Sequence, residues 1–327
     1  MRDNRQMHVR RVASSFVVGA ALMLTACADT GSPSQVSSEP PPSNSARPIV
    51  ITADDLGPIP QLATTTDVSA PQRIVSLATG IGETLVSLGA GERVVGRDEA
   101  SAVAELVDVP VVTEAHSASA ERVLALDPDL VLIDAASGPP EVIDQIRSAG
   151  ITVREIPQAW TLEDLNPRTA AVADAIGADT PALVESLPEG EAAADVERPS
   201  VAFLYLRGTS AIYLLGGEGS GADALIEAAG GRDVGTDLGL PAFTPLTAES
   251  LIGANPDVLV VMTQGLESVG GLEGLLALPG VESTNAARDR AVIAVDDNVL
   301  LSFGPRTPQL ISELSSAITR VTDREPV

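Results

Sequence analysis

Short apolar runs alternate along the chain with stretches whose apolar residues recur every three or four positions. Runs rich in β-branched residues, such as 73–77 (RIVSL) and 130–133 (LVLI), predict buried strands, and the stretches that follow them predict helices. Strands that alternate with helices form parallel βαβ units. Further strands are expected at 93–96, 152–156, 201–207, 257–262 and 291–295, and further helices at 119–126, 139–150 and from Thr307.

The strand signal stops between the two halves of this pattern. Residues 161–198 read as helices interrupted by Pro167, Pro181 and Pro188. We therefore expect an N-terminal lobe at 72–160 and a C-terminal lobe at 199–327. The predicted fold class is α/β, with central parallel-type sheets in two lobes that a helical backbone joins.

One segment of the first lobe has a counterpart in the second. SAERVLALDPDLVLI (119–133) aligns without gaps to TAESLIGANPDVLVV (247–261). Glutamate early in a helix suits the helix dipole and proline suits its end, so local physics explains part of the match. The gapless register nevertheless predicts two similar lobes, with Glu121 and Glu249 in equivalent places at their outer ends.

The N-terminus has the pattern of a secretory signal. Four arginines precede an apolar run of about 15 residues, which is shorter than the roughly 20 that a membrane span needs, and Leu-Thr-Ala-Cys follows. The alternative is a single membrane helix with an incidental cysteine. We predict a signal peptide at 1–27 and a disordered Ser/Pro-rich tether at 28–71. Cys27 is the only cysteine, so the chain forms no internal disulfide.

Composition excludes several classes of function. The formal net charge is −25 and all twenty basic residues are arginine, which argues against nucleic acid or an anionic membrane surface as the partner. His116 is the only histidine outside the expected leader, so a catalytic triad would depend on it and a zinc site lacks ligands. We expect no enzyme activity. The rival is a nucleotide-dependent oxidoreductase that uses the loop 217–221, where Glu218 would repel a pyrophosphate.

Tyr205 and Arg207 form the sharpest chemical pattern. Residues two apart on a strand point to the same face, and a guanidinium beside a phenol lowers the phenol's pKa from about 10. A phenolate is a donor suited to ferric iron. Tyr213 is the other available tyrosine, and the plain alternative is a strand-end tyrosine beside a surface arginine. A flat ligand such as ferric haem would receive one axial ligand from each lobe, His116 and Tyr205.

The whole pattern resembles a known family. Leu-Thr-Ala-Cys resembles the lipobox of bacterial lipoproteins, and residues 72 to about 322 resemble the helical-backbone (class III) substrate-binding proteins of ABC importers. More narrowly, the chain is similar to the haemin-binding lipoproteins of HmuT type. This likeness rests on the motifs HSASAERVLALDPDLVL, YLRG, GSGADALIEAAGG, VMTQGLESVGGLEGLLALPGV and LSFGPRT. The inter-lobe connection, broken at Pro188 and Gly190, is shorter than the helix usual in that family.

The resemblance implies roles for residues of the cleft. His116 and Tyr205 would be the axial ligands of the haem iron, and Arg207 would hydrogen-bond the tyrosine. Met262 would be a haem-pocket residue. Because the chain has no lysine, Arg306 and Arg207 are the nearest candidates to pair with the haem propionates.

The resemblance also implies partners and a location. Glu121 and Glu249 would dock onto arginines of the permease, and lipid on Cys27 would anchor the protein to the outer face of the cell membrane. The expected function is extracytoplasmic binding of haem b and its delivery to an ABC permease. A ferric siderophore or a corrinoid is the alternative cargo. Siderophore pockets favour several basic and aromatic side chains, whereas this chain has one tryptophan, two tyrosines and four phenylalanines, of which Phe243 and Phe303 are expected near the cleft.

Overall fold

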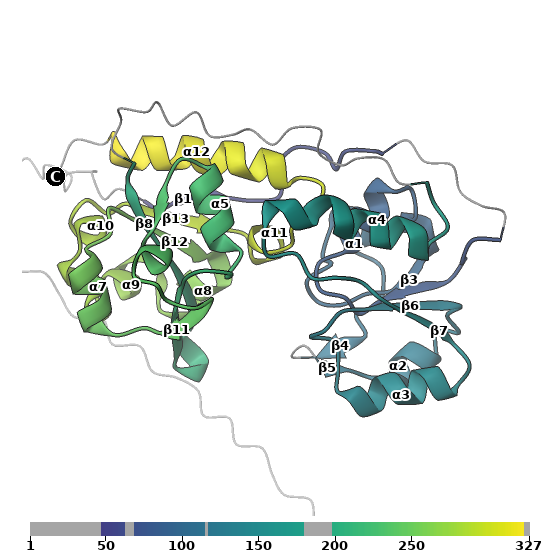
Figure 1. The fold of residues 1–327 in the computed structure, drawn as a ribbon. Coiled ribbons are helices and arrows are strands. Elements are labelled where there is room, and N and C mark those ends of the chain that lie inside the picture. The colour runs from purple at the N-terminus through teal and green to yellow at the C-terminus, as the bar shows by residue number, and fades with distance from the viewer. Residues whose placement is uncertain (1–46, 63–68, 115–116, 180–197, 324–327) are drawn as a thin grey trace, which may run out of the picture. The chain divides into compact units, whose positions relative to one another are not determined.

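The strands of the N-terminal lobe form one parallel sheet. Its order is β3 (Val94–Gly96), β2 (Ile74–Ser76), β6 (Leu130–Ile133) and β7 (Thr152–Glu155). The computed structural model describes residues 47–62, 69–114, 117–179 and 198–323, all within one unit, Ala46–Val327 (Figure 1). All four strands lie close to their predicted positions.

Strand β6 is buried on both faces of this sheet. Leu130 and Leu132 pack with α1 (Gly82–Ser87) and α4 (Leu165–Ala175), whereas Val131 packs with α2 (Ala120–Leu124) and α3 (Pro140–Ser148) on the other face. Neighbouring residues of a strand point to opposite faces, so burial on both sides requires every residue to be apolar. This is why residues 130–133 of β6 form a continuous apolar run.

The sheet of the C-terminal lobe is mixed. Its order is β1 (Ile49–Ile51), β13 (Val292–Val295), β12 (Val258–Met262), β8 (Ser200–Arg207), β9 (Ile212–Gly216) and β11 (Phe243–Pro245), with β10 (Arg232–Asp233) also paired to β8. Strands β1, β13, β12 and β8 are parallel, but β9 and β11 are antiparallel to their neighbours. Helices α5 (Ala222–Ala228) and α12 (Thr307–Thr322) cover one face, and α7 (Ala248–Ala254) and α9 (Gly271–Leu276) contribute to the core on the other.

Strand β1 corrects the predicted tether. It lies inside the range 28–71, yet it pairs in parallel with β13, and Ile51 is buried in the C-terminal core. Three apolar residues are too few to show a period, and the Ser/Pro-rich surroundings hid them. The expected signal peptide with Cys27 and the first part of the tether lie outside the described residues. Within the described ranges no helix combines the length and apolarity needed to cross a membrane.

Helix α4 contacts both lobes. Leu165 near its start belongs to the core of the C-terminal lobe, and Val172 two turns later belongs to the core of the N-terminal lobe. Between them the buried guanidinium of Arg168 donates to the carbonyl of Thr79 in one lobe and of Ser302 in the other. The predicted helical connection is therefore present at 165–175, while residues 180–197 lie outside the described residues.

The structure confirms the internal repeat. Ser119 and Thr247 both cap their helices, accepting hydrogen bonds from the third amide that follows. Asp127, two residues after the C-cap of α2, and Asn255, the C-cap of α7, have φ of 46° and 44°, in the left-handed region. Asp129 accepts two backbone amides from the residues just before β2, and the equivalent Asp257 accepts the amide of Ser200 at the start of β8. Matching caps and strand contacts show that the lobes share one local design.

Candidate functional site

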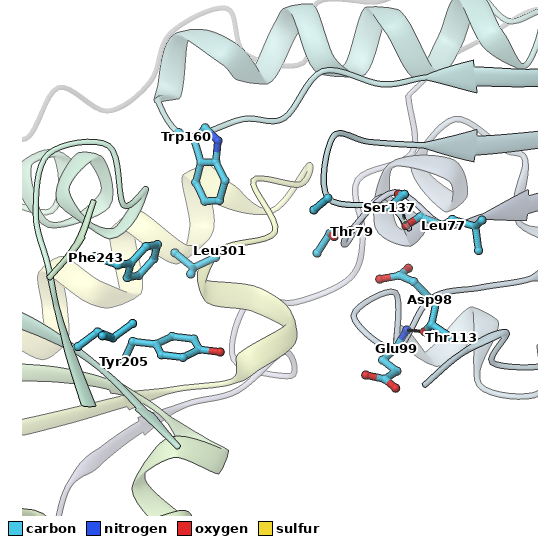
Figure 2. Close-up of a pocket in the computed structure, with 12 residues that line it drawn as sticks. Leu77, Thr79, Asp98, Glu99, Thr113, Ser137, Trp160, Tyr205, Phe243 and Leu301 are labelled. Atoms are coloured by element: carbon cyan, nitrogen blue, oxygen red, sulfur yellow. Dashed lines mark hydrogen bonds between the residues drawn. The ribbon is translucent and has the colours of Figure 1, made fainter. Parts of the chain in front are cut away.

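A cleft lies at the carboxyl ends of the parallel strands of both lobes, where open α/β sheets place their ligands. Its larger cavity is about 510 Å³, within the range of roughly 300–1,000 Å³ that small-molecule and cofactor sites occupy. The lining residues are Leu77, Thr79, Asp98, Glu99, Thr113, Ala136, Ser137, Trp160, Tyr205, Leu214, Phe243 and Leu301 (Figure 2). The lining is mainly apolar and aromatic on the side of the C-terminal lobe.

A second cavity of about 500 Å³ adjoins the first. The two share Thr79, Glu99, Tyr205 and Leu301 as lining residues. The second cavity adds Gly80, Ala100, Arg207, Met262, Gln264, Asp297, Asn298 and Ser302. Tyr205 therefore stands where an apolar compartment meets a more polar one.

Tyr205 is held between an aromatic ring and a cation. Its ring meets Phe243 edge to face, with centroids 5.8 Å apart and an interplanar angle of 69°. The guanidinium carbon of Arg207 lies 4.6 Å from the centre of the same ring. Figure 2 shows the hydroxyl pointing from the C-terminal lobe toward the side of the cavity that carries Asp98 and Glu99. The period of the strand thus brings Tyr205 and Arg207 together as predicted.

Sheet geometry separates the two tyrosines. Tyr205 packs beside the core that α5 and α12 cover. Tyr213 lies on β9 and packs against the core on the opposite face of the sheet. It lines neither of the two cavities described above. Of the two, Tyr205 alone is placed to contact a ligand in the cleft.

Asp297 anchors Arg207. One carboxylate oxygen, Oδ2, accepts from the Thr263 hydroxyl at 3.0 Å and the Gln264 amide at 2.9 Å. The other oxygen, Oδ1, lies 3.4 Å from a guanidinium nitrogen of Arg207. Asp297 is nearly buried, so its charge fixes the arginine over the tyrosine ring. No local sequence pattern marks this residue, although it lies two positions after the end of the predicted strand 291–295.

The wall of the N-terminal lobe carries buried carboxylates. Asp134 accepts from the amide of Thr79 at 2.7 Å and from the hydroxyl of Ser137 at 2.8 Å, which fixes two lining residues. Asp98 accepts from the Ser101 hydroxyl and from the amide of Ala100. Burial raises the pKa of the Asp98 carboxyl above its usual range, although these hydrogen bonds oppose the shift. The wall opposite Tyr205 is therefore rigid and polar.

Arg306 is not a residue of the cleft, which corrects its expected pairing with a propionate. Its side chain is buried and forms an ion pair with Glu83, with nitrogen–oxygen distances of 2.9 Å. The remaining donors reach the carbonyls of Ala53 and Gly57. Phe303 is likewise buried in the C-terminal core, whereas Phe243 lines the cavity.

The other expected site residues fall into three groups. Met262 ends β12 and lines the second cavity, as expected of a pocket residue. Glu121 and Glu249 are exposed in the first turns of α2 and α7. His116 lies outside the described residues. The strands on either side of it, β4 (Thr113–Glu114) and β5 (Ser117–Ala118), are paired, and Thr113 lines the first cavity.

The glycine loop after β9 is a turn. Gly219 and Gly221 have φ of 83° and 82°, which favours glycine. The amide of Gly219 donates to Asp223, and the amide of Glu218 donates to Leu240. Since these amides already have acceptors within the chain, the loop is not arranged to bind a pyrophosphate. Trp160, the only tryptophan of the chain, lines the cavity, and its rarity is the one feature of the sequence that marks it.

Comparison with known proteins agrees with this geometry. The periplasmic heme-binding protein RhuT from Roseiflexus sp. RS-1 is 39% identical, covering 77% of this chain and 99% of its own, with a TM-score of 0.72. The heme binding protein HmuT is 30% identical, covering 83% of this chain and 97% of its own, with a TM-score of 0.73. It has also been solved with alanine at a histidine, at a tyrosine and at an arginine two positions after that tyrosine.

A third relative carries a different ligand in its name. A cobalamin-binding protein of Halobacterium salinarum is 27% identical over 335 residues, covering 97% of this chain and 86% of that protein. The family model described as "Periplasmic binding protein" matches residues 74–299. Two α/β lobes, a cleft at their strand ends and this match together show that the chain belongs to the periplasmic binding protein family.

Proposed function

We propose that the protein binds haem in the cleft and delivers it to an ABC permease. The observation that carries this proposal is the position of Tyr205, whose hydroxyl enters the cleft where two cavities of about 500 Å³ meet. Phe243 and Arg207 hold its ring from two directions. The names of RhuT and HmuT, the solved relatives at 39% and 30% identity, support haem as the ligand.

Tyr205 and His116 are the proposed axial ligands of the haem iron. A phenolate oxygen and an imidazole nitrogen are both established haem ligand types. The alanine variants of HmuT, at a histidine and at a tyrosine and arginine two positions apart, match the residue types of His116, Tyr205 and Arg207. Arg207, held by Asp297, acts on the tyrosine, and Met262 contributes to the pocket. Binding is proposed to be non-catalytic, with haem b as cargo.

Haemin titration of the purified protein tests this assignment. We expect a visible spectrum distinct from free haemin, and a weakened or altered spectrum after Tyr205→Phe and His116→Ala. Tyr213→Phe is the matched control, because it removes the same hydroxyl on the opposite face of the sheet and should leave the spectrum unchanged. A wild-type spectrum identical to that of free haemin would refute haem binding.

A corrinoid is the second candidate cargo. Its support is the cobalamin-binding relative from Halobacterium salinarum, whose alignment covers 97% of this chain. Equilibrium dialysis against cyanocobalamin and haemin under the same conditions separates the two. Haemin retained far more strongly than cyanocobalamin is the expected result.

The protein is proposed to work outside the cytoplasmic membrane, anchored by lipid on Cys27. Leu-Thr-Ala-Cys after an apolar run supports this location, as does membership of the periplasmic binding protein family. Labelling cells with a radioactive fatty acid should mark the wild-type chain and leave Cys27→Ser unmarked. Glu121 and Glu249 are the proposed contacts to the permease.

A further inference from the structure

One helix in each lobe exposes a glutamate and, three residues later, a large apolar side chain. In α2, the exposed Glu121 is followed three residues later by Leu124, which is 37% exposed. In α7, the exposed Glu249 is followed three residues later by Ile252, which is 52% exposed. Residues three apart lie on the same side of a helix. Each helix therefore presents a carboxylate beside an apolar side chain.

The repeat makes these pairs equivalent. Leu124 and Ile252 occupy the same position of the aligned segments 119–133 and 247–261, whose N-caps and left-handed residues also correspond. The residues directly before them, Val123 and Leu251, are fully buried and hold the helices to their cores. Core packing thus explains the inward residues but not a large apolar side chain on the outer side of both copies.

Single exposed apolar residues are common on protein surfaces. What distinguishes these two is that they recur at equivalent positions, each beside a glutamate. Within the described part of the chain, neither Glu121 nor Glu249 takes part in any of the ion pairs that the structure contains. Each carboxylate is therefore available to a basic group of a partner.

We propose that Leu124 and Ile252 are the apolar anchors of two equivalent docking patches, which seat on the two equivalent subunits of a two-fold symmetric permease. The proposal rests on the function proposed above. Two equivalent patches on one chain are complementary to a partner that carries the same binding surface twice, as a two-fold symmetric dimer does. Each binding surface of the permease is expected to combine an arginine or lysine with an apolar pocket. Its positive charge would complement this chain, whose net charge is −25.

The two components of each patch have different effects. Charges at the rim of an interface mainly speed association, whereas apolar side chains buried at its centre slow dissociation. Losing one buried Leu or Ile anchor is expected to weaken docking by about tenfold, and losing both by about a hundredfold. Glutamates alone would give a contact that salt screens and that lacks this apolar contribution.

Leu124→Ser and Ile252→Ser, singly and together, test the proposal. Leu238→Ser and Val107→Ser are matched controls, because these residues are also exposed but are not part of the repeat. Each full-length variant replaces the wild-type gene in the source cell, protein amounts are matched by immunoblot, and uptake of ⁵⁵Fe-haemin is measured at limiting haemin. Haemin titration of each purified variant checks the cleft.

We expect uptake to fall about tenfold in the single variants and further in the double variant. The haemin spectra should stay unchanged, and the control variants should take up haemin as wild type does. Uptake of the double variant equal to wild type, or an equal loss in the controls, overturns the docking patches. If wild type binds no haemin, the proposed cargo fails, and the same comparison with labelled cyanocobalamin decides the docking patches. If wild type takes up neither haemin nor cyanocobalamin, the proposed transport function and the docking patches are both overturned.

Discussion

Replacing Glu83 by alanine would leave the buried guanidinium of Arg306 without its carboxylate. Both side chains are less than a tenth exposed. Oxygen Oε1 of Glu83 accepts the backbone amide of Arg306 at 2.7 Å, and Oε2 accepts two guanidinium nitrogens at 2.9 Å. The pair joins α1 of the N-terminal lobe to the start of α12 in the C-terminal lobe.

The structure sets the size of the effect. Removing one partner of a buried ion pair costs about 3–5 kcal/mol, because the remaining charge is left uncompensated. Arg306 would keep its bonds to the carbonyls of Ala53 and Gly57, so we expect the lower end, about 3 kcal/mol. With an m-value of about 3 kcal/mol/M, the urea midpoint would fall by about 1 M. Arg306→Met should cost a similar amount.

Urea unfolding followed by circular dichroism measures this loss, and haemin titration of the folded protein accompanies it. The double variant Glu83→Leu with Arg306→Met is the control, because replacing both charges by apolar groups should restore most of the stability. We expect haemin affinity to stay within about threefold of wild type in the folded variants, since neither residue lines the two cavities. If Arg306→Met instead left the midpoint unchanged and weakened haemin binding more than tenfold, Arg306 would be a propionate partner and this reasoning would be refuted.

Two further changes probe the anchor of Arg207 and a buried carboxyl. Asp297→Ala removes the ion pair that holds Arg207 over Tyr205. Haemin affinity should therefore fall about fivefold, which corresponds to about 1 kcal/mol, and the haemin spectrum should change. A variant with the affinity and spectrum of wild type would contradict this. Burial raises the pKa of Asp233 to about 6, so the folded protein binds this proton more tightly than the unfolded chain. The free energy of unfolding should therefore fall as pH rises from about 4 to about 6, and Asp233→Asn should remove this component. Urea midpoints of wild type and Asp233→Asn at pH 4 and pH 7 measure this component. If the midpoint of wild type differed from that of the variant by the same amount at both pH values, the prediction would be refuted.

Sequence patterns predicted the strands that lie at the centre of a sheet. Residues 130–133 and 257–262 were recognised because a central strand covered on both faces must be apolar throughout. Strand β1 was missed because it has three residues at a sheet edge, and β9 because its residues 212–216 run straight into a glycine-rich turn. Edge and hairpin strands depend on a partner strand rather than on a local period.

The site was predicted where its residues are close in sequence. Tyr205 and Arg207 meet because strand geometry alone places residues two apart on one face. Arg306 was misassigned because its partner Glu83 is 223 positions away, and no local pattern records such a pairing. Asp297, which anchors Arg207 from a different strand end, was missed for the same reason.

By itself the sequence determined the order of the central strands and of the helices beside them, the repeat that relates the lobes, and the supply of ligand residues, with one histidine outside the expected leader and two tyrosines. Only the tertiary structure decided which of these residues meet. It placed Tyr205 at the cleft and Tyr213 on the opposite face, and it buried Arg306 against Glu83. Secondary structure follows from local periodicity, whereas a binding site forms where distant segments are packed together, and the packing assigns each charge its partner.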